Sequence, residues 1–417
     1  MKLLTAGSLF SGIGSFEKSL TNIGIDIDLK YYCEIDKYAS KSYSAIHNID
    51  ESHNLWDITK IDIESLPYVD MITHGSPCQD FSVAGKQKGG NKGSNTRSSL
   101  MWNTVEIIKH TKPKYIIWEN VKNVLSAKHI HNFKKYKKTL RELGYNNYSK
   151  VINAKYWGVP QNRERIFIVS IRKDIDTGFC FPISSLEGQQ SLFNQNVIDI
   201  ELKVLRGVLE ANVDEKYYID DDKVKELLKE LNAKEIGINP CITSDRLNKR
   251  QKAVVRNEDK WRIKNDGVTN CLDANYGKGI DYHGARTGVL ELNKIGNIYP
   301  SNGQNGEIYN SNGVSPSLRS GQGVKGRGIG SCNSPKILTQ YRIRKLTPLE
   351  CWKLMGFDDK DYWKARNKLE DKYYNGADRS DSQCYKMAGN SIVVNVLEYI
   401  FKELFKDRLA QALYKPF

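Results

Sequence analysis

The sequence predicts an α/β protein with a mostly parallel, doubly wound sheet and a second, smaller domain that is rich in loops. Three features support this fold class. Residues 1–171 alternate short β-branched or aromatic runs with longer amphipathic stretches, a pattern typical of strands joined by crossover helices. Glycine and asparagine become dense between residues 237 and 330, which favours loops and short strands. A chain of 417 residues is too long for one compact core, so two domains are expected.

The expected elements follow in chain order. The acidic stretch 220–235 predicts a solvated helix, and helical periodicity returns over 347–355 and 392–405. Thr347, followed by proline, resembles a helix start with threonine as the cap. Glycine-rich or polar turns follow most of the expected strands, at the edge where open α/β sheets bind ligands. The strands expected before residue 172 are Lys2–Leu9, Leu29–Glu34, Val69–His74, Lys114–Trp118, Tyr148–Ala154 and Ile166–Ile171.

The composition is that of a soluble globular protein, with 39% hydrophobic and 27% charged residues. The chain has no apolar run of transmembrane length and no cleavable signal pattern at its start, so we expect a cytoplasmic protein with no membrane partner. Its eight cysteines include no Cys-x-x-Cys pair, which argues against a zinc site and a disulfide framework. The net charge of +14 favours a polyanionic partner, although many basic proteins bind none.

Closely spaced glycines follow the first expected strand, in Phe10-Ser11-Gly12-Ile13-Gly14. They allow a tight turn and a close approach of the backbone to a cofactor. The full Gly-x-Gly-x-x-Gly signature is absent because Glu17 occupies the third position. About twenty residues later, Glu34 ends the second strand, where a carboxylate commonly binds ribose hydroxyls. Together these features predict a cofactor that contains adenosine.

Cys78 lies on a polar loop after the third expected strand, in Gly75-Ser76-Pro77-Cys78-Gln79. A cysteine is more often buried and inert, but the polar neighbours argue against burial here. An accessible thiolate can act as a nucleophile. Downstream, a glycine-hinged loop carries Lys86, Lys88 and Lys92. This loop is suited to closing over a phosphate backbone. The alternative is that it is a surface loop with no such role.

Two further motifs carry charged side chains at the ends of strands. Glu119, after the fourth strand, can bind a substrate nitrogen, although it could equally cap a helix. Arg163 and Arg165 precede the last strand and offer guanidinium groups for a base carbonyl or a phosphate. Arginine pairs are more often parts of surface ion pairs, so neither motif by itself decides the function.

The order of these motifs is more specific than any one of them. It runs Phe-x-Gly-x-Gly, a glutamate at the second strand, Pro-Cys-Gln, Glu-Asn-Val, Gln-x-Arg-x-Arg and a final Gly389-Asn390-Ser391. This succession resembles the cytosine-5 DNA methyltransferases of bacterial and phage type. The resemblance is close over residues 1–171 and 341–396 and includes Asp57-Ile58. Between these regions it thins to residues 306–320, which look like the target-recognition core of that family.

The sequence also departs from the family pattern. Ser8 and Ser15 stand where many members have aspartate and glycine, and Trp56 stands where many have glycine before the Asp-Ile pair. These departures affect fine contacts to the cofactor and leave the motifs of the reaction intact.

The resemblance implies a Rossmann-like S-adenosylmethionine-dependent enzyme that methylates carbon 5 of a flipped cytosine in double-stranded DNA. S-adenosylhomocysteine would be the product, and no metal would be needed. The implied organisation is a catalytic and cofactor-binding domain at 1–171, a hinge and target-recognition domain at 172–340, and a C-terminal segment at 341–417 that rejoins the first. A monomer is expected, in a restriction-modification system with a cognate restriction endonuclease encoded nearby.

The resemblance also assigns roles to residues. Cys78 would be the nucleophile, Glu119 would bind ring nitrogen 3 of cytosine, and Arg163 and Arg165 would fix the base carbonyl and the closed loop. The residues implied in cofactor binding are Phe10, Gly12, Gly14, Glu34, Ile35, Asp57, Ile58, Pro77, Asn390 and Ser391. The residues implied in DNA binding are Gln79, Ser82, Lys86, Lys88, Lys92, Ser317, Arg319 and Ser320.

Two other functions fit parts of the sequence. An RNA cytosine methyltransferase would share the catalytic motifs, but the basic segment 240–340 with its recognition core favours DNA. A catalytically dead DNA-binding homologue would not need Cys78, Glu119 and Arg163 together. An amino-group methyltransferase is disfavoured because the chain contains neither Asp-Pro-Pro-Tyr nor Asn-Pro-Pro-Tyr.

Overall fold

The computed structural model describes residues 3–77, 97–187, 197–201, 205–218, 252–257, 260–264, 269–270, 287–291, 294–297, 307–309 and 342–413. By its packing the chain divides into two compact units. Unit 1 comprises Met1–Lys203 and Trp352–Phe417, and unit 2 comprises Val204–Cys351. The boundaries predicted from the sequence, after residues 171 and 340, lie N-terminal to these two divisions of the chain. No helix in the described part of the chain is long and apolar enough to cross a membrane.

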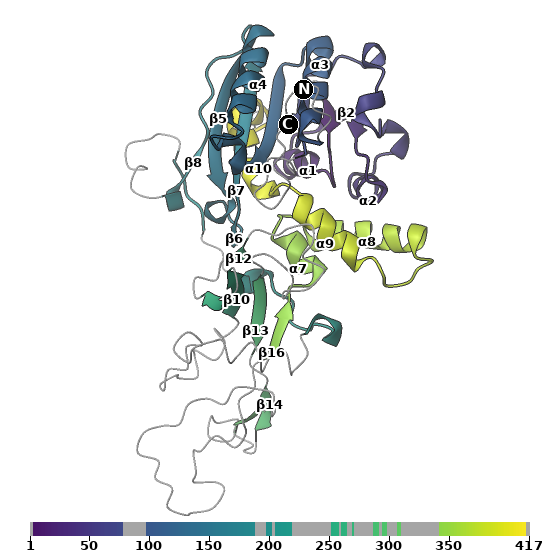
Figure 1. Ribbon diagram of the computed structural model, residues 1–417, viewed down its shortest axis with the longest axis vertical. Coiled ribbons are helices and arrows are strands. Elements are labelled where there is room, and N and C mark those ends of the chain that lie inside the picture. The colour runs from purple at the N-terminus through teal and green to yellow at the C-terminus, as the bar shows by residue number, and fades with distance from the viewer. Residues whose placement is uncertain are drawn as a thin grey trace, which may run out of the picture. The chain divides into compact units, whose positions relative to one another are not determined.

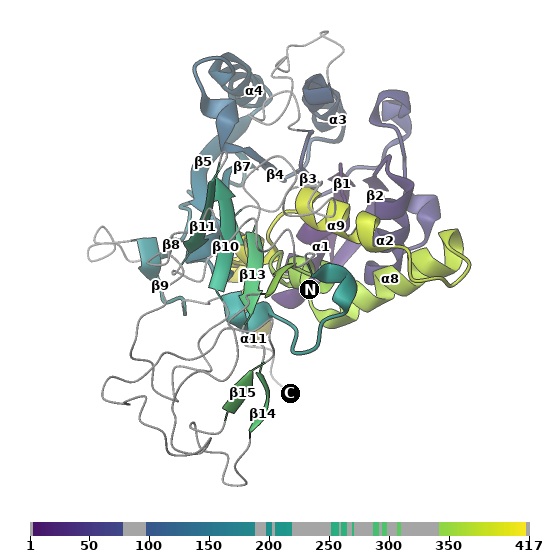
Figure 2. The ribbon, with the colours of Figure 1, turned by 60° about the horizontal axis from the view of Figure 1, so that its bottom comes forward.

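Unit 1 is built on a six-stranded sheet with the order β2-β1-β3-β4-β7-β5, which can be followed across Figure 2. Neighbouring strands from β2 to β4 are parallel, and β7 runs antiparallel to both β4 and β5. The mostly parallel sheet and its six predicted strands are therefore confirmed, with shifted ends. The strands are β1 (Leu4–Leu9), β2 (Ile27–Cys33), β3 (Met71–His74), β4 (Tyr115–Val121), β5 (Tyr145–Asn153) and β7 (Glu164–Arg172).

Helices from both ends of the chain pack in unit 1. C-terminal α10 contacts α1, and α8 lies beside α2 in Figure 1. The helix predicted over 392–405 is confirmed as α10. The helices are α1 (Ser15–Asn22), α2 (Lys37–His47), α3 (Met101–Thr111), α4 (Ile130–Glu142), α8 (Asp359–Tyr373), α9 (Asp381–Asn390), α10 (Val394–Leu404) and α11 (Lys406–Leu413). Short strands β6 (Gln161–Asn162), β8 (Ile183–Ser184) and β9 (Val197–Ile198) complete the unit.

The alternation of side chains along the central strands accounts for this layering. On β4, Ile116 and Trp118 belong to the buried cluster that includes the apolar residues of α3 and α4. Tyr115, one residue out of phase, meets Phe405 with ring centroids 5.2 Å apart. Because successive strand residues point to opposite faces, the apolar run Tyr115–Trp118 of β4 is covered on both sides of the sheet.

The register of the sheet brings the predicted motifs to one edge. Leu9 pairs with Cys33 on one side and with His74 on the other, and His74 pairs with Trp118. The residues that follow these four paired positions, Phe10, Glu34, Gly75 and Glu119, therefore stand in a row at the carboxyl ends of the strands.

Unit 2 contains a four-stranded antiparallel sheet with the order β11-β10-β13-β16 and a separate pair, β14 with β15. Short strands were expected in this part of the chain, and the predicted helix 220–235 lies outside the described residues. The elements are β10 (Lys252–Asn257), β11 (Lys260–Lys264), β12 (Thr269–Asn270), β13 (Thr287–Glu291), β14 (Lys294–Asn297), β15 (Glu307–Tyr309), β16 (Arg342–Lys345) and the start of α7 (Pro348–Lys353).

Candidate active site

The loop after β1 adopts left-handed backbone at three positions, Phe10, Gly12 and Gly14, with φ of 55°, 57° and 84°. The Gly14 N–H donates to the Ser11 carbonyl at 2.9 Å, which closes the turn into α1. A Cβ at Gly12 would meet no atom within 4 Å, whereas one at Gly14 would collide with the His47 imidazole. Glycine is thus required at position 14, and position 12 leaves open space above the loop.

Glu34 fastens this loop to the end of β2. Its carboxylate accepts the N–H of Gly12 at 2.9 Å and the N–H of Asp36 at 2.8 Å. Burial raises the pKa of Glu34, and these two backbone N–H groups oppose that rise. Each carboxylate oxygen can accept more than one hydrogen bond, so a ligand hydroxyl could still bind here.

Three other residues implied in cofactor binding surround the same strand ends. Asp57 caps the short 3₁₀ helix Ile58–Lys60 by accepting the Thr59 N–H at 3.0 Å. Ile58 is buried, while the Ile35 side chain is 70% exposed. Such an exposed isoleucine is available to an apolar part of a ligand.

The backbone leading to the predicted nucleophile is fixed from β4. The Trp118 indole donates to the Ser76 hydroxyl at 2.9 Å, and the Asn120 amide donates to the Ser76 carbonyl at 3.0 Å. Pro77 follows and is half-buried. Cys78 and the DNA-binding candidates of the same loop, Gln79, Ser82, Lys86, Lys88 and Lys92, lie outside the described residues.

Glu119 lies beside this loop, since a Cβ added at Gly75 would be 3.8 Å from Glu119 Oε2. Glu119 is buried, and its Oε1 is 3.0 Å from Arg165 Nε. Burial raises the pKa of the Glu119 carboxyl, while the positive charges of Arg165 and Arg163 oppose the rise. The antiparallel register of β4 and β7, which pairs Val121 with Arg165, brings these charges together.

Arg163 makes different contacts from Arg165. Its Nη2 donates to the Ser391 carbonyl at 2.6 Å and to the Gly389 carbonyl at 3.3 Å. The Ser391 hydroxyl is in turn 3.4 Å from the Ser15 hydroxyl at the start of α1. Arg163 therefore ties the C-terminal Gly-Asn-Ser motif to the sheet, while Asn390 is exposed.

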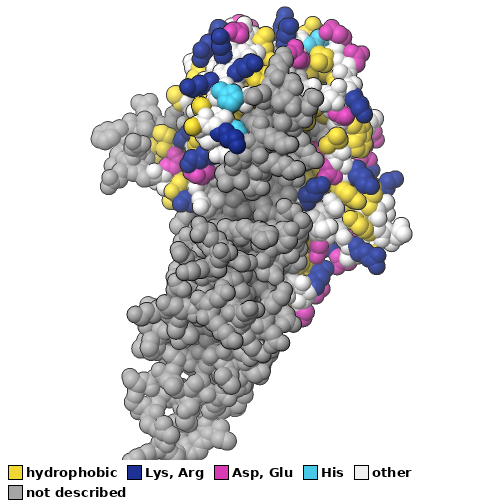
Figure 3. Space-filling view, viewed as in Figure 1, with side chains coloured by type: hydrophobic (Ala, Val, Ile, Leu, Met, Phe, Trp, Pro, Cys, Tyr) yellow, Lys and Arg dark blue, Asp and Glu magenta, His cyan; other side chains and the backbone are white. Residues whose placement is uncertain are grey.

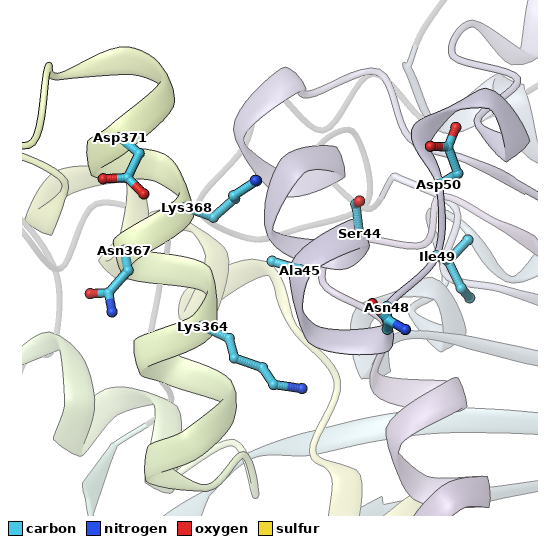
Figure 4. Close-up of a pocket in the computed structure, with 9 residues that line it drawn as sticks. All are labelled: Ser44, Ala45, Asn48, Ile49, Asp50, Lys364, Asn367, Lys368 and Asp371. Carbon is cyan, nitrogen blue, oxygen red and sulfur yellow. The ribbon is translucent and has the colours of Figure 1, made fainter.

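The remaining candidates, Ser317, Arg319 and Ser320, lie outside the described residues. Figure 3 shows basic and acidic side chains interspersed over the described part of one face. A polar pocket of about 590 Å³ opens between α2 and α8 (Figure 4), and none of the candidate residues lines it. Lys364 at this pocket donates to the Ile46 carbonyl at 3.3 Å and so caps α2.

Sequence reasoning missed two buried residues that support the site. Asn54 accepts the Glu34 N–H and donates to the Glu34 carbonyl, both at 3.0 Å. His74 ends β3 and is 2.8 Å from the Tyr136 hydroxyl, and burial lowers the pKa of His74 to about 3. The position of His74 directly before the cysteine loop was a usable signal, whereas the sequence around Asn54 carries none.

Comparison with known proteins decides the family. The family described as C-5 cytosine-specific DNA methylase matches residues 4–406. The chain belongs to this family. The chain is similar to the orphan methyltransferase M.SPRI of Bacillus phage SPR, which is 35% identical over 97% of this chain and 98% of that protein. The type II methyltransferase M2.ScrFI of Lactococcus lactis subsp. cremoris is 32% identical over 93% of this chain and 82% of that protein.

A solved structure supports the fold. The methyltransferase EhMeth of Entamoeba histolytica superposes with a TM-score of 0.57 and 19% sequence identity, covering 98% of this chain and 99% of that one. The family match over residues 4–406 and these relatives confirm the resemblance of the motifs to the cytosine-5 DNA methyltransferases, and the chain is an enzyme of that class.

Proposed function

We propose that this cytosine-5 DNA methyltransferase recognises a specific sequence in double-stranded DNA and methylates a flipped cytosine through a covalent Cys78 adduct. One observation carries the proposal. Glu119 is buried beside Gly75, three residues before Cys78, and is paired with Arg165. A carboxyl group that can hold a proton thus lies at the carboxyl edge of the sheet, beside the segment Gly75–Pro77 that precedes Cys78 in the chain.

The residues at this edge fit S-adenosylmethionine. The open space at Gly12, the Glu34 carboxylate and the exposed Ile35 suit a ligand with a sugar and an apolar ring. Phe10, Gly14, Asp57, Ile58, Pro77, Asn390 and Ser391 are proposed to complete the binding site. When bound, this cofactor supplies the electrophilic sulfonium methyl group that carbon 5 accepts, and S-adenosylhomocysteine remains.

Carbon 5 of cytosine is a poor nucleophile, so the protein must first place electrons in the ring. The Cys78 thiolate adds to carbon 6 while Glu119 donates a hydrogen bond or proton at nitrogen 3, which gives an enamine. After methylation, water takes the proton from carbon 5, the bond from carbon 6 to the Cys78 sulfur breaks to release the thiolate, and any proton at nitrogen 3 returns to Glu119, which restores the aromatic ring. Arg165 holds the Glu119 carboxyl in place, and Arg163 holds the chain around Ser391.

The ring faces of a stacked cytosine are inaccessible, so the base must leave the duplex. Flipping costs a few kcal/mol, which contacts to phosphate and to the orphan base must offset. We assign the phosphate contacts to the loop of Lys86, Lys88 and Lys92 and the reading of sequence to residues 240–340. Relatives of this chain include orphan phage and type II methyltransferases, which supports a role in protecting cytoplasmic DNA from a restriction endonuclease.

The test of this function is methyl transfer by the Cys78→Ser variant. We expect tritiated methyl transfer to duplex DNA to fall below detection, because an alkoxide is far scarcer than a thiolate at neutral pH. Binding of S-adenosylhomocysteine should be unchanged. DNA with 5-fluorocytosine at the target should trap the wild-type protein in a denaturation-resistant complex, since fluorine cannot leave as a proton.

The control substrate is tRNA, and hydrolysis of the product identifies the methylated base. Preferential labelling of tRNA would contradict the assignment to DNA. Near-normal transfer by Cys78→Ser would contradict the covalent mechanism.

A further inference from the structure

Two aromatic residues of unit 1 have left-handed backbone, Phe10 with φ 55° and Trp56 with φ 59°. The other non-glycine residues with positive φ in the described part of the chain are two asparagines and a lysine. Bulky side chains rarely adopt this conformation. It persists where the surrounding structure enforces it, and such positions gather at ligand sites. Trp56 therefore calls for a functional explanation.

The backbone of Trp56 is held on both sides. Its N–H donates to Asn54 Oδ1 at 2.9 Å, and its carbonyl accepts from Cys33 Sγ at 3.2 Å. The same Asn54 oxygen accepts the Glu34 N–H at 3.0 Å. One buried amide thus fixes Trp56 and Glu34 relative to each other.

The sheet places Phe10 in the same neighbourhood. Leu9 pairs with Cys33, so Phe10 follows one strand where Glu34 follows the next, and Cys33 also contacts Trp56. The side chain of Trp56 is 42% exposed and that of Ile35 is 70% exposed. Few large apolar side chains in the described part of the chain are this exposed, and these two flank Glu34 in the structure.

We propose that Trp56 is an adenine-binding residue of this enzyme. Its indole covers the purine of the methyl donor, next to Phe10, while Glu34 accepts from the ribose. A flat ring system suits an aromatic side chain, because stacking gains contact area with little loss of side-chain freedom. The left-handed backbone at Trp56 orients the indole toward the ligand, which explains why this strained conformation is kept. This inference rests on the proposed cofactor site.

The experiment measures binding by calorimetry, with S-adenosylhomocysteine and with adenosine as separate probes. Trp56→Gly should weaken both about tenfold, and Trp56→Phe should stay within about threefold of wild type. Glycine tolerates the left-handed backbone, so the melting temperature of Trp56→Gly should not fall. In the methylation assay the KM for S-adenosylmethionine should rise while kcat changes little.

Trp363→Ala is the matched control, since Trp363 is 48% exposed and lies on α8. It should bind both probes as wild type does. Wild-type affinity in Trp56→Gly would overturn the assignment of Trp56 while leaving the cofactor site intact. A loss toward S-adenosylhomocysteine but not adenosine would overturn the contact to adenine. No binding by the wild-type protein would instead overturn the proposed cofactor, and with it this inference.

Discussion

Glu119 is subject to two opposing influences. Burial disfavours its carboxylate and raises its pKa, while Arg165 and Arg163 favour the carboxylate and oppose that rise. Because its pKa is raised, the Glu119 carboxyl can carry a proton at a pH where an exposed glutamate would have lost it. The proposed reaction uses this proton at nitrogen 3, whereas it needs Cys78 without its proton.

These two requirements predict the pH dependence of the wild-type enzyme and of Glu119→Gln. In the wild type, kcat/KM should rise and then fall with pH, because activity needs a protonated Glu119 together with a Cys78 thiolate. The glutamine variant should be about 10²- to 10⁴-fold slower and should lack the falling limb, since only the thiol still titrates. Single-turnover methylation at a series of pH values measures both profiles.

Asn120→Asp, next to Glu119 on β4, is not a suitable control because Asn120 holds Ser76. Glu142→Gln, on the exposed end of α4, is suitable, and its profile should match the wild type. A falling limb that survives in Glu119→Gln would assign the alkaline loss of activity to another group.

Individual residues also show what the sequence could and could not predict. The positions of Glu34 and Glu119 could be predicted because each comes directly after an apolar or aromatic run of its strand, Glu34 just past β2 and Glu119 near the end of β4. The different contacts of Arg163 and Arg165 could not. The two arginines are equivalent in the motif, and only the packing of Ser391 from more than two hundred residues away distinguishes them.

At the level of elements, the strands were predictable because their apolar runs are short and continuous. The direction of β7 is not encoded in such a run, since an apolar strand has the same pattern in either direction. The signal was the short connection of residues 154–163, because a parallel crossover needs a dozen or more residues. The helix start at Thr347 was predicted from local sequence and is confirmed by reciprocal bonds between Thr347 and Glu350.

Glu350 has a second role that the local pattern did not indicate. Its carboxylate pairs with Arg344 of β16 at 2.8 Å, and both side chains are completely buried. It also accepts the N–H of Glu210 at 2.8 Å. One carboxylate thus joins a strand, a helix start and a loop within unit 2.

We therefore predict that Glu350→Ala lowers the free energy of unfolding by about 3–5 kcal/mol, because Arg344 would remain buried without its main counter-charge. The control is Glu142→Gln, which removes the exposed pair with Lys138 and should cost less than about 0.5 kcal/mol. Urea denaturation followed by tryptophan fluorescence measures both. Equal losses in the two variants would show that the buried pair contributes no more than a surface pair.

At the scale of the whole molecule, the motifs of residues 1–171 and the C-terminal Gly389-Asn390-Ser391 motif meet in unit 1, because the sheet register and the bond from Arg163 to Ser391 join them. The family resemblance made that convergence predictable. The family resemblance did not make the recognition of bases by residues 240–340 predictable in the same way. Base recognition depends on the shape of loops, and loop shape is set by contacts that a single sequence does not display.

Different roles are proposed for the lysine loop and for residues 240–340, and each role makes a prediction about DNA binding. If Lys86, Lys88 and Lys92 contact phosphate, replacing them with alanine should weaken DNA binding about equally on all sequences. The salt dependence should flatten by about one unit of slope for each lost contact. Filter binding at several salt concentrations, on the target site and on an unrelated duplex, measures both effects. A loss confined to the target site would show that these lysines read sequence.

Arg319 in the recognition core should behave differently. If it makes a bidentate contact to a guanine, Arg319→Ala should cost about 1–3 kcal/mol on the proper site and relax the preference at one base pair. Arg319→Lys should recover little of this, because lysine cannot form the bidentate pair. Methylation kinetics on a panel of single-base-pair variants of the site decide the matter. A uniform loss across the panel would assign Arg319 to the DNA backbone, and base recognition would then belong to other residues of 240–340.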